Sequence, residues 1–431
     1  MPKGKKKGRS DRHRIDGSLQ TSDDDSFPND NMSVVSNFSE SCSVDDGNND
    51  PEDFAQDQLE DKLTEIIDGL SQKSSQGRTN CFKSFSKALV KKYMPSYIKD
   101  RTFTLSDCIE RSLKKGAADE KCAAAELATV ICVQLGTDPV GEDIFRNLRP
   151  ILLATACDGS ASSRVRGQCC LALGNIAFLS GGDIAENLIL MQQLESVFSG
   201  SYLKGDGSVP NTTPEVGAMH AAALNAWALL FTLIVPGNIG SLMNAKNLPS
   251  LDQISDLLES AHLEVRMAAG EALALVYELG REEDEDFEED FAVDLIETLK
   301  QLATDSHKYR AKKDRKQQRA TFRDILLFIE EDTVPELRIK FNKESLVLDT
   351  WVKRKQYDAL CNILGPSINN HLVENDLIKD IFQIEESEVE NRIPAYAQNQ
   401  MERFKKKVLN AANDKARTLS RAKNRDKRSD F

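Results

Sequence analysis

The sequence predicts a mainly α-helical protein in which pairs of helices stack into a solenoid, followed by a small C-terminal α+β module and a basic C-terminal helix. Three observations support this fold class: five segments with helical periodicity, a near-regular spacing between them, and capping residues at their ends. Apolar residues recur in these segments every three or four positions, which places them on one helix face. The segments are residues 77–92, 120–135, 164–179, 218–233 and 264–279.

The helical segments are spaced like a repeat. Residues 164–179 and 264–279 align at an offset of 100, so that Val165 matches Val265. Equivalent positions of all five segments are 43, 45, 54 and 46 residues apart, and the longest step contains a loop insertion at residues 205–215. Repeats of about 40–47 residues built from helix pairs are typical of HEAT and armadillo proteins. The positions compared are Arg78, Lys121, Arg166, His220 and Arg266.

Helix boundaries are marked by residues that favour caps. Ser160 or Ser162 can accept a backbone N–H at the start of the third segment, and Ser260 can do so for the last. Glycines follow several segments, where a helix often ends in a left-handed conformation. We therefore expect C-terminal caps at Gly136, Gly181 and Gly280.

A different pattern follows the repeats. Residues 336–341 and 345–351 alternate apolar and polar side chains, which predicts a short hairpin. Helical stretches follow at residues 352–364 and 366–382. Residues 398–428 contain no Gly or Pro and are rich in Ala, Lys, Arg and Asn, so we expect a long helix there.

Composition completes the division of the chain into parts. The first 54 residues are rich in Ser, Asp and Asn and cannot bury enough apolar surface to fold. The acidic stretch 281–290 is expected to be a solvated loop or a helix start, because it lacks the spacing of a calcium loop. The predicted parts are a disordered tail (1–54), an armadillo-like helical repeat domain (55–331), a small α+β module (332–397) and a basic helix (398–431).

The net charge of -13 is unevenly distributed along the chain. Residues 1–14 hold seven Lys/Arg against one Asp, and residues 15–61 hold fourteen Asp/Glu and no Lys/Arg. Residues 401–428 hold eleven Lys/Arg against three Asp/Glu, whereas residues 62–400 carry a net -12. Charge blocks of this kind usually belong to interacting or solvated tails.

Cysteine usage and hydropathy indicate an intracellular protein. None of the nine cysteines forms a C-x-x-C pair, and most lie in apolar helical stretches, so we expect reduced core thiols. No apolar run is long enough to cross a membrane, and the basic N-terminus lacks the apolar stretch of a secretory signal. The cysteines are Cys42, Cys81, Cys108, Cys122, Cys132, Cys157, Cys169, Cys170 and Cys361.

The sequence carries no motif of known catalytic chemistry. It has no G-x-S-x-G, no phosphate-binding glycine loop and no H-E-x-x-H. The five histidines are far apart and are expected to be surface or core residues rather than ligands. We therefore expect no enzyme activity, no metal, no cofactor and no small-molecule substrate. The histidines are His13, His220, His262, His307 and His371.

At the level of longer motifs, the chain resembles the interferon-related developmental regulator family from about residue 55 to the end. The similarity lies in residues 107–136 (DCIERSLKKGAADEKCAAAELATVICVQLG), 157–162 (CDGSAS), 269–279 (AGEALALVYEL), 302–326 (LATDSHKYRAKKDRKQQRATFRDIL) and 421–431 (RAKNRDKRSDF). The resemblance implies an armadillo-like body and a small C-terminal domain. It also implies a regulatory role, either in transcriptional co-regulation or in translational silencing on ribosomes.

The sharpest binding signal is the basic C-terminal helix. Arg417, Arg421 and Arg425 fall on one helix face, and small Ala and Ser positions between them suit a phosphate-lined channel. The expected RNA-binding residues are Arg403, Lys405, Lys406, Lys407, Lys415, Arg417, Arg421, Lys423, Arg425, Lys427 and Arg428, with a second group of Lys312, Lys313, Arg315, Lys316 and Arg319. The alternatives are a nuclear import signal, a solvated tail or contacts with acidic proteins.

Two tryptophans complete the set of candidates. Trp227 is expected in the core, whereas Trp351, at the end of a predicted strand and followed by basic residues, either packs in the core or stacks on a base.

Together with the basic helix, the resemblance implies a non-enzymatic regulator, in the cytoplasm and also expected in the nucleus, that binds ribosomes or ribosomal RNA through this helix and restrains translation. Protein partners are expected on the solenoid surface, and no membrane is involved. The alternative is a nuclear scaffold that acts in transcriptional co-regulation through partners on the concave solenoid face.

Overall fold

The computed structural model describes residues 51–304, 311–342 and 344–384, with side chains from residue 58 onward. The chain divides into two compact units, residues 1–55 and 56–431, and nearly all of the described residues belong to the second unit. The disorder expected for residues 1–54 and the helix expected at 398–428 lie outside the described residues, except that residues 51–54 begin a helix.

The repeat region is entirely helical, which confirms the predicted fold class. Its elements are α1 (Pro51–Gly69), α2 (Ser75–Lys91), α3 (Pro95–Lys99), α4 (Thr102–Lys115), α5 (Ala118–Leu135), α6 (Pro139–Cys157), α7 (Ser163–Ser180), α8 (Ile184–Phe198), η1 (Ser199–Ser201), α9 (Pro214–Phe231), η2 (Pro236–Asn238), α10 (Ile239–Asn244), α11 (Leu251–Asp256), η3 (Leu257–Glu259), α12 (Leu263–Arg281), α13 (Glu289–Thr304) and α14 (Lys312–Glu331).

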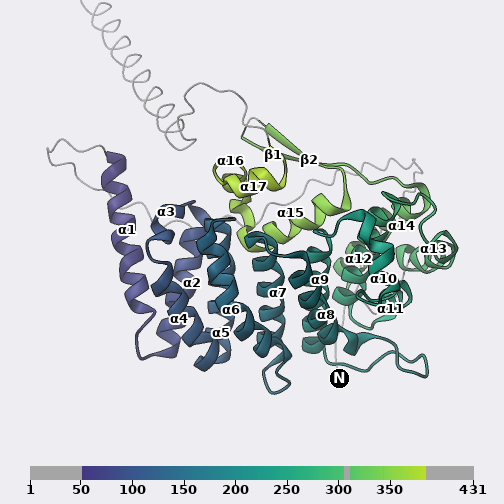
Figure 1. Ribbon diagram of the computed structural model, residues 1–431, viewed down its shortest axis with the longest axis horizontal. Helices are drawn as coiled ribbons and strands as arrows, with labels where there is room; N and C mark the ends of the chain where they lie inside the picture. The colour runs from purple at the N-terminus through teal and green to yellow at the C-terminus, as the bar shows by residue number, and fades with distance from the viewer. Residues whose placement is uncertain (1–50, 305–310, 343, 385–431) are drawn as a thin grey trace, which may run out of the picture. The chain divides into compact units, whose positions relative to one another are not determined.

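Six of these helices, α2, α5, α7, α9, α12 and α14, form what we call the central row. Each contacts the next, and α4, α6, α8, α11 and α13 each pack against one of them: α4 on α5, α6 on α7, α8 on α9, α11 on α12 and α13 on α14 (Figure 1). The five periodic segments of the sequence are the first five helices of this row. Their many Ala and Leu side chains are buried because each helix is covered by neighbours on several sides.

The central row is packed closely at small residues. A Cβ added at Gly174 of α7 would lie 2.6 Å from the Cβ and 2.8 Å from the Cα of Ala226 in α9. In the same way, a Cβ at Gly270 of α12 would meet the Phe322 ring of α14 at 2.8 Å. Glycine at these positions therefore sets the distance between successive helices.

The compared repeat positions have a shared structural role in several repeats. Arg166 donates from Nε to the Ala156 carbonyl at 2.8 Å, and Arg266 donates from Nη1 to the Ser260 carbonyl at 2.6 Å. His220 pairs through Nδ1 with the Ser201 hydroxyl at 2.6 Å. In these helices of the central row, a polar side chain near the start of the helix thus fixes the loop or turn that precedes the helix.

The predicted helix ends are partly correct. Ser162 caps α7 by accepting from the Val165 N–H, and Gly136 and Gly181 end α5 and α7 with φ of 61° and 75°. The prediction that Ser260 caps α12 was wrong. The N-cap of α12 is His262, whose N–H donates to the Ser260 hydroxyl.

The prediction for Gly280 was also wrong. It lies inside α12, where a Cβ would meet the Phe287 ring at 2.5 Å, so the glycine is needed for close packing and not for a left-handed turn.

The residues after the repeats form the expected hairpin and helices. Strands β1 (Leu337–Phe341) and β2 (Glu344–Leu348) pair antiparallel, with Leu337 opposite Leu348. They are followed by α15 (Trp351–Leu364), η4 (Gly365–Ser367), α16 (Ile368–Glu374) and α17 (Asp376–Ile381). The single helix expected at 366–382 is therefore broken, because Asn375 leaves the helical conformation and caps α17. Trp351 begins α15 rather than ending a strand.

Helix α15 packs directly on the central row. It contacts α2, α5, α9 and α12, which belong to different repeats (Figure 1). Further along, His371 Nε2 donates to the Val90 carbonyl at 2.9 Å, and Asn375 Nδ2 donates to the Val133 carbonyl at 2.8 Å. The end of the module is thereby fixed on α2 and α5.

A membrane span requires a helix of sufficient length and apolar composition. No single helix in the described part of the chain is long and apolar enough to cross a bilayer, and α9 with Pro236–Asn244 reaches the length and composition only as a pair bent by 111°.

Substituting Gly174 should test the packing of the central row. We expect Gly174→Val to lower the free energy of unfolding by about 2–3 kcal/mol, because the new side chain must push α9 away. Gly159→Val is the control, since no atom lies within 4 Å of a Cβ added there. Urea denaturation of both variants measures the difference, and equal stability would contradict the packing argument.

Candidate functional site

The predicted RNA-binding residues fall into two groups. The group between Arg403 and Arg428 lies outside the described residues. The other group lies at the start of α14, where Lys312, Lys313 and Lys316 are exposed. Cations near a helix N-terminus oppose the helix dipole, so these lysines do not stabilise α14 itself and remain candidates for an anionic partner.

The two arginines of this group are less available. Arg315 and Arg319 are half-buried, and Arg319 Nε donates to the Arg315 carbonyl at 3.3 Å. The prediction of RNA contacts stays open for all five residues of the group.

Trp351 and Trp227 both belong to the core. Trp351 is 6% exposed and packs near Phe328, with the Arg354 guanidinium 5.2 Å from its ring centre. Trp227 is 1% exposed and stacks on Phe231. The alternative in which Trp351 stacks on a base is therefore wrong, because its ring is covered.

Helix α15 is held at its N-terminus by a carboxylate from the repeat domain. Glu278 of α12 accepts from the Trp351 N–H at 2.7 Å and the Val352 N–H at 2.8 Å. The third N–H of the helix, from Lys353, donates to the Thr350 hydroxyl at 3.1 Å. An anion at a helix N-terminus is stabilised by the free N–H groups and the helix dipole.

The position of Glu278 has an electrostatic cost. Burial raises the pKa of Glu278 above its usual value, although the two backbone N–H donors from α15 act in the opposite direction. Without α15 in place, the carboxylate would lose both donors.

One turn further along α15, a lysine is seated on the central row. Lys355 Nζ lies 2.9 Å from a carboxylate oxygen of Glu271 and 2.5 Å from the amide oxygen of Asn225. Gln356 adds a hydrogen bond to the Thr232 hydroxyl. Two helices of the central row, α9 and α12, thus share one basic side chain of the C-terminal module.

A groove of about 710 Å³ lies between α15 and the central row. Helix α15 contributes Lys355 and Asp358 to its lining. The central row contributes Glu126, Gln168, Asn175, Asn225, Glu264 and Glu271. Because four carboxylates face one lysine, we call this cavity the acidic groove.

Asp358 titrates in an unusual range because of its place in the acidic groove. Partial burial, followed by the Glu271 carboxylate, raises the pKa of Asp358 to about 6, while Lys355 and Arg354 limit the shift. The side chain remains accessible to solvent. The charge of the groove therefore decreases in mildly acidic conditions.

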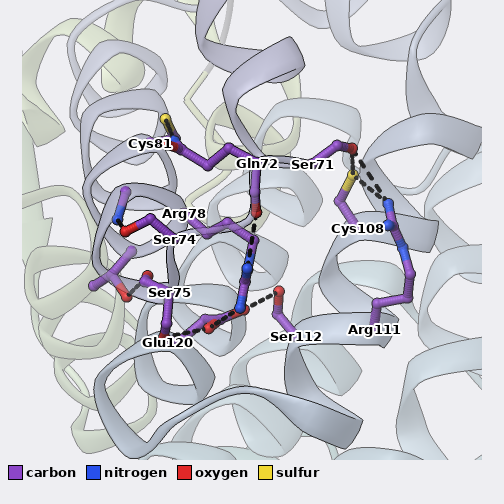
Figure 2. A network of polar contacts seen from close by, with 12 residues as sticks. Ser71, Gln72, Ser74, Ser75, Arg78, Cys81, Cys108, Arg111, Ser112 and Glu120 are labelled. Atoms are coloured by element: carbon purple, nitrogen blue, oxygen red, sulfur yellow. Dashed lines mark hydrogen bonds and ion pairs between the residues drawn. The ribbon is translucent and has the colours of Figure 1, made fainter.

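A second polar cluster, around Glu120, is structural. Figure 2 shows Arg78, Ser75 and Ser112 converging on this buried carboxylate, with donor distances of 2.7–2.8 Å. Burial alone would raise the pKa of Glu120, but these hydrogen bonds outweigh it and lower the value. The carboxylate accepts hydrogen bonds from side chains of α2 and α4, so the cluster joins these two helices to α5 beside a small cavity of about 170 Å³.

Burial shifts the pKa of several cysteine and histidine side chains away from neutral pH. Burial raises the pKa of Cys132, Cys169 and Cys170 to about 12, and lowers the pKa of His220 to about 4. Five cysteines are buried as expected, whereas Cys157 is exposed. No group of His, Cys, Asp or Glu in the described residues could hold a metal ion.

Sequence reasoning missed the docking residues Glu271 and Glu278. Both lie in the apolar stretch AGEALALVYEL, where the apolar pattern predicts only part of a buried helix. Their spacing of seven residues places both on one face of α12. A carboxylate pair on a helix that is otherwise buried is a signal that something polar must cover it.

Two family models match the chain. Residues 31–330 match the family described as interferon-related developmental regulator, and residues 375–429 match the interferon-related protein conserved region. Interferon-related developmental regulator 2 of Mus musculus is 39% identical over 381 residues, covering 88% of this chain and 85% of the relative. Interferon-related developmental regulator 1 of Sus scrofa is 38% identical over 382 residues, covering 88% and 83%.

Among solved structures, a designed armadillo repeat protein is similar with a TM-score of 0.39 and 16% identity. The match covers 61% of this chain and 99% of the designed protein.

Removing the Glu278 carboxylate should loosen α15. We expect Glu278→Ala to lower the free energy of unfolding by about 1–2 kcal/mol, because two helix N–H groups lose their acceptor. Amide hydrogen exchange at Trp351 and Val352 should become faster. Glu285→Ala, an exposed change in the loop after the same helix, is the control and should leave both exchange rates unchanged.

The titration of Asp358 should appear in the pH dependence of stability. Since its pKa is higher in the folded protein, the folded chain binds more protons between about pH 4 and 6, and stability falls as pH rises through this window. Asp358→Asn should raise the melting temperature at pH 7.5 by about 1–2 °C, a small effect for an accessible group, and leave it unchanged at pH 4.

Asp349→Asn is the contrasting variant for this measurement. The hydrogen bond from Lys353 lowers the pKa of Asp349, so removing its charge should decrease stability at pH 7.5. An equal response of both variants at the two pH values would contradict the assignment.

Proposed function

Because this chain belongs to the interferon-related developmental regulator family, we propose that it is a non-enzymatic regulator that binds ribosomes and restrains translation. The contact is made by the basic C-terminal segment, residues 401–428, with ribosomal RNA. The protein then works in the cytoplasm.

The observation that carries the proposal is the separation of charge along the chain. Residues 401–428 hold eleven Lys/Arg, whereas residues 62–400 carry a net -12. An acidic body repels RNA wherever no basic patch intervenes, so the affinity must concentrate in the basic segment. The family's C-terminal conserved region, matched at 375–429, includes this segment.

The anchoring of the module supports the same proposal. Asn375 and His371 hold the last described helices on α5 and α2, so the described part of the module ends at a fixed position, and residues 385–400 connect it to the basic segment. A fixed starting point limits the entropy lost when a segment binds. The exposed Lys312, Lys313 and Lys316 of α14 are the second expected contact.

A nuclear scaffold that recruits proteins in transcriptional co-regulation is the second candidate function. It is favoured by Phe103 of α4, which is 89% exposed and would suit an apolar anchor for a protein partner. It is disfavoured by α15, which already covers part of the central row on which a partner would lie.

The salt dependence of RNA binding tests the proposal. If about five to eight basic side chains neutralise phosphates on single strands, the log–log slope of affinity against salt should be about -4 to -6. Deleting residues 401–431 or introducing Arg417→Glu, Arg421→Glu and Arg425→Glu should remove most of this slope. Binding to purified ribosomes, measured by sucrose-gradient sedimentation at matched salt, should fall in parallel.

The matched control reverses three exposed lysines with the same spacing on α2. Lys83→Glu, Lys87→Glu and Lys91→Glu change the net charge equally and should leave most of the slope. If the truncated chain sediments with ribosomes as strongly as the full chain, the segment serves another purpose, such as nuclear import, and the scaffold function takes its place.

A further inference from the structure

We propose that the acidic groove is a binding site for Lys and Arg side chains, and that in the absence of RNA its occupant is the chain's own basic segment, residues 401–428. The regulatory part of this inference rests on the proposed function, because it takes this segment as the one that binds RNA. The groove itself is formed entirely by described residues.

The groove already binds one basic side chain from the C-terminal part of the chain. Lys355 of α15 is held by the Glu271 carboxylate and the Asn225 amide oxygen, one from α12 and one from α9. A carboxylate supplies charge, and an amide oxygen adds a directed acceptor for the ammonium group. This contact defines the chemistry that the groove offers.

Further carboxylates and amides line the groove. Gln168 and Asn175 of α7 are half-buried, and Glu126 of α5 and Glu264 of α12 are exposed at the lining. Within the described residues, none of these four side chains forms a hydrogen bond or ion pair. Two carboxylates and two amides are therefore available for further basic side chains.

The charge of the groove supports the same kind of ligand. Glu126, Glu264, Glu271 and Asp358 are opposed within the lining only by Lys355. Four carboxylates and one lysine give the lining a net charge of -3, and the basic segment carries a net charge of +8. The groove can pair with only a few of the eleven basic side chains, so it binds the basic segment weakly. A polyanion such as RNA can therefore displace the segment from the groove.

The basic segment is within reach of the groove. The last described residues are fixed on α2 and α5, and α5 also provides Glu126 of the groove lining. Residues 385–400 connect this point to the basic segment and can span up to about 55 Å when extended. A tethered segment has an effective concentration in the millimolar range, which compensates for weak individual contacts.

Zero-length crosslinking of the full chain tests the site directly. A carbodiimide joins lysines to carboxylates in contact, so without RNA we expect intramolecular links from Lys405, Lys406, Lys407 or Lys415 to Glu126 or Glu264. Peptide mass spectrometry of the monomer identifies the linked residues. Links from the groove to residues 1–14 or to a second molecule, or no links at all, would overturn the proposed occupant.

RNA affinity provides the second measurement. In the full chain, Glu126→Gln with Glu264→Gln should free the basic segment and tighten binding of a single-stranded oligonucleotide about 3- to 10-fold. Glu65→Gln with Glu289→Gln removes the same charge from exposed positions on α1 and α13 and should change affinity less than about 2-fold, by the same reasoning. If both double variants changed the RNA affinity equally, the effect would come from net charge alone. Competition between the groove and RNA for the basic segment would then be contradicted.

The two readouts separate this inference from the proposed function. Crosslinks in a chain that binds neither RNA nor ribosomes would contradict the proposed function and retain the groove site. RNA binding through residues 401–428 with no crosslinks to the groove would contradict the groove site and retain the function. Glu264 lies in the first turn of α12, where a negative charge stabilises the helix dipole. The melting temperature of the Glu264→Gln variant is therefore measured as well, to separate a loss of stability from a change in binding.

Discussion

The placement of the C-terminal module depends on the bidentate contact between the Glu278 carboxylate and the first two N–H groups of α15. It places a charged group of the repeat domain where a helix dipole can stabilise it, and it sets the point at which α15 begins. From that point the helix runs over the central row and brings Lys355 to Glu271. The acidic groove exists because this helix covers the row without filling it.

This arrangement changes how a helical repeat protein can be used. A solenoid offers its row of stacked helices to partners, but here α15 packs on that row, and His371 of α16 and Asn375 at the start of α17 are hydrogen-bonded to it. The module is held by buried polar contacts such as Asn375 with the Val133 carbonyl, which a partner would have to replace. Binding is therefore expected at the edges of the row, in the groove that remains, and on the segment that follows the module.

The repeat body could be predicted from the sequence, and the docking of the module could not. Apolar periodicity follows from burial of one helix face, so the segments around Arg166 and Arg266 indicated their helices correctly. Gly280 and Ser260 were misassigned because the same residue types serve close packing and local turns as well as caps. The hydrogen bond between Lys355 and Asn225 joins residues far apart in sequence. A local sequence pattern does not predict which faces of two such distant helices will be in contact.

The hydrogen bond from His371 to the Val90 carbonyl joins residues 281 positions apart, and this separation has a consequence for synthesis. While the chain is made, the first repeats can stack as soon as they leave the ribosome, since each needs only its neighbours. The helix that contacts α2, α5, α9 and α12 is made after all of the repeats. Until then each repeat of the nascent chain is held only by its neighbours in the row, and the contacts that join distant repeats form late in translation.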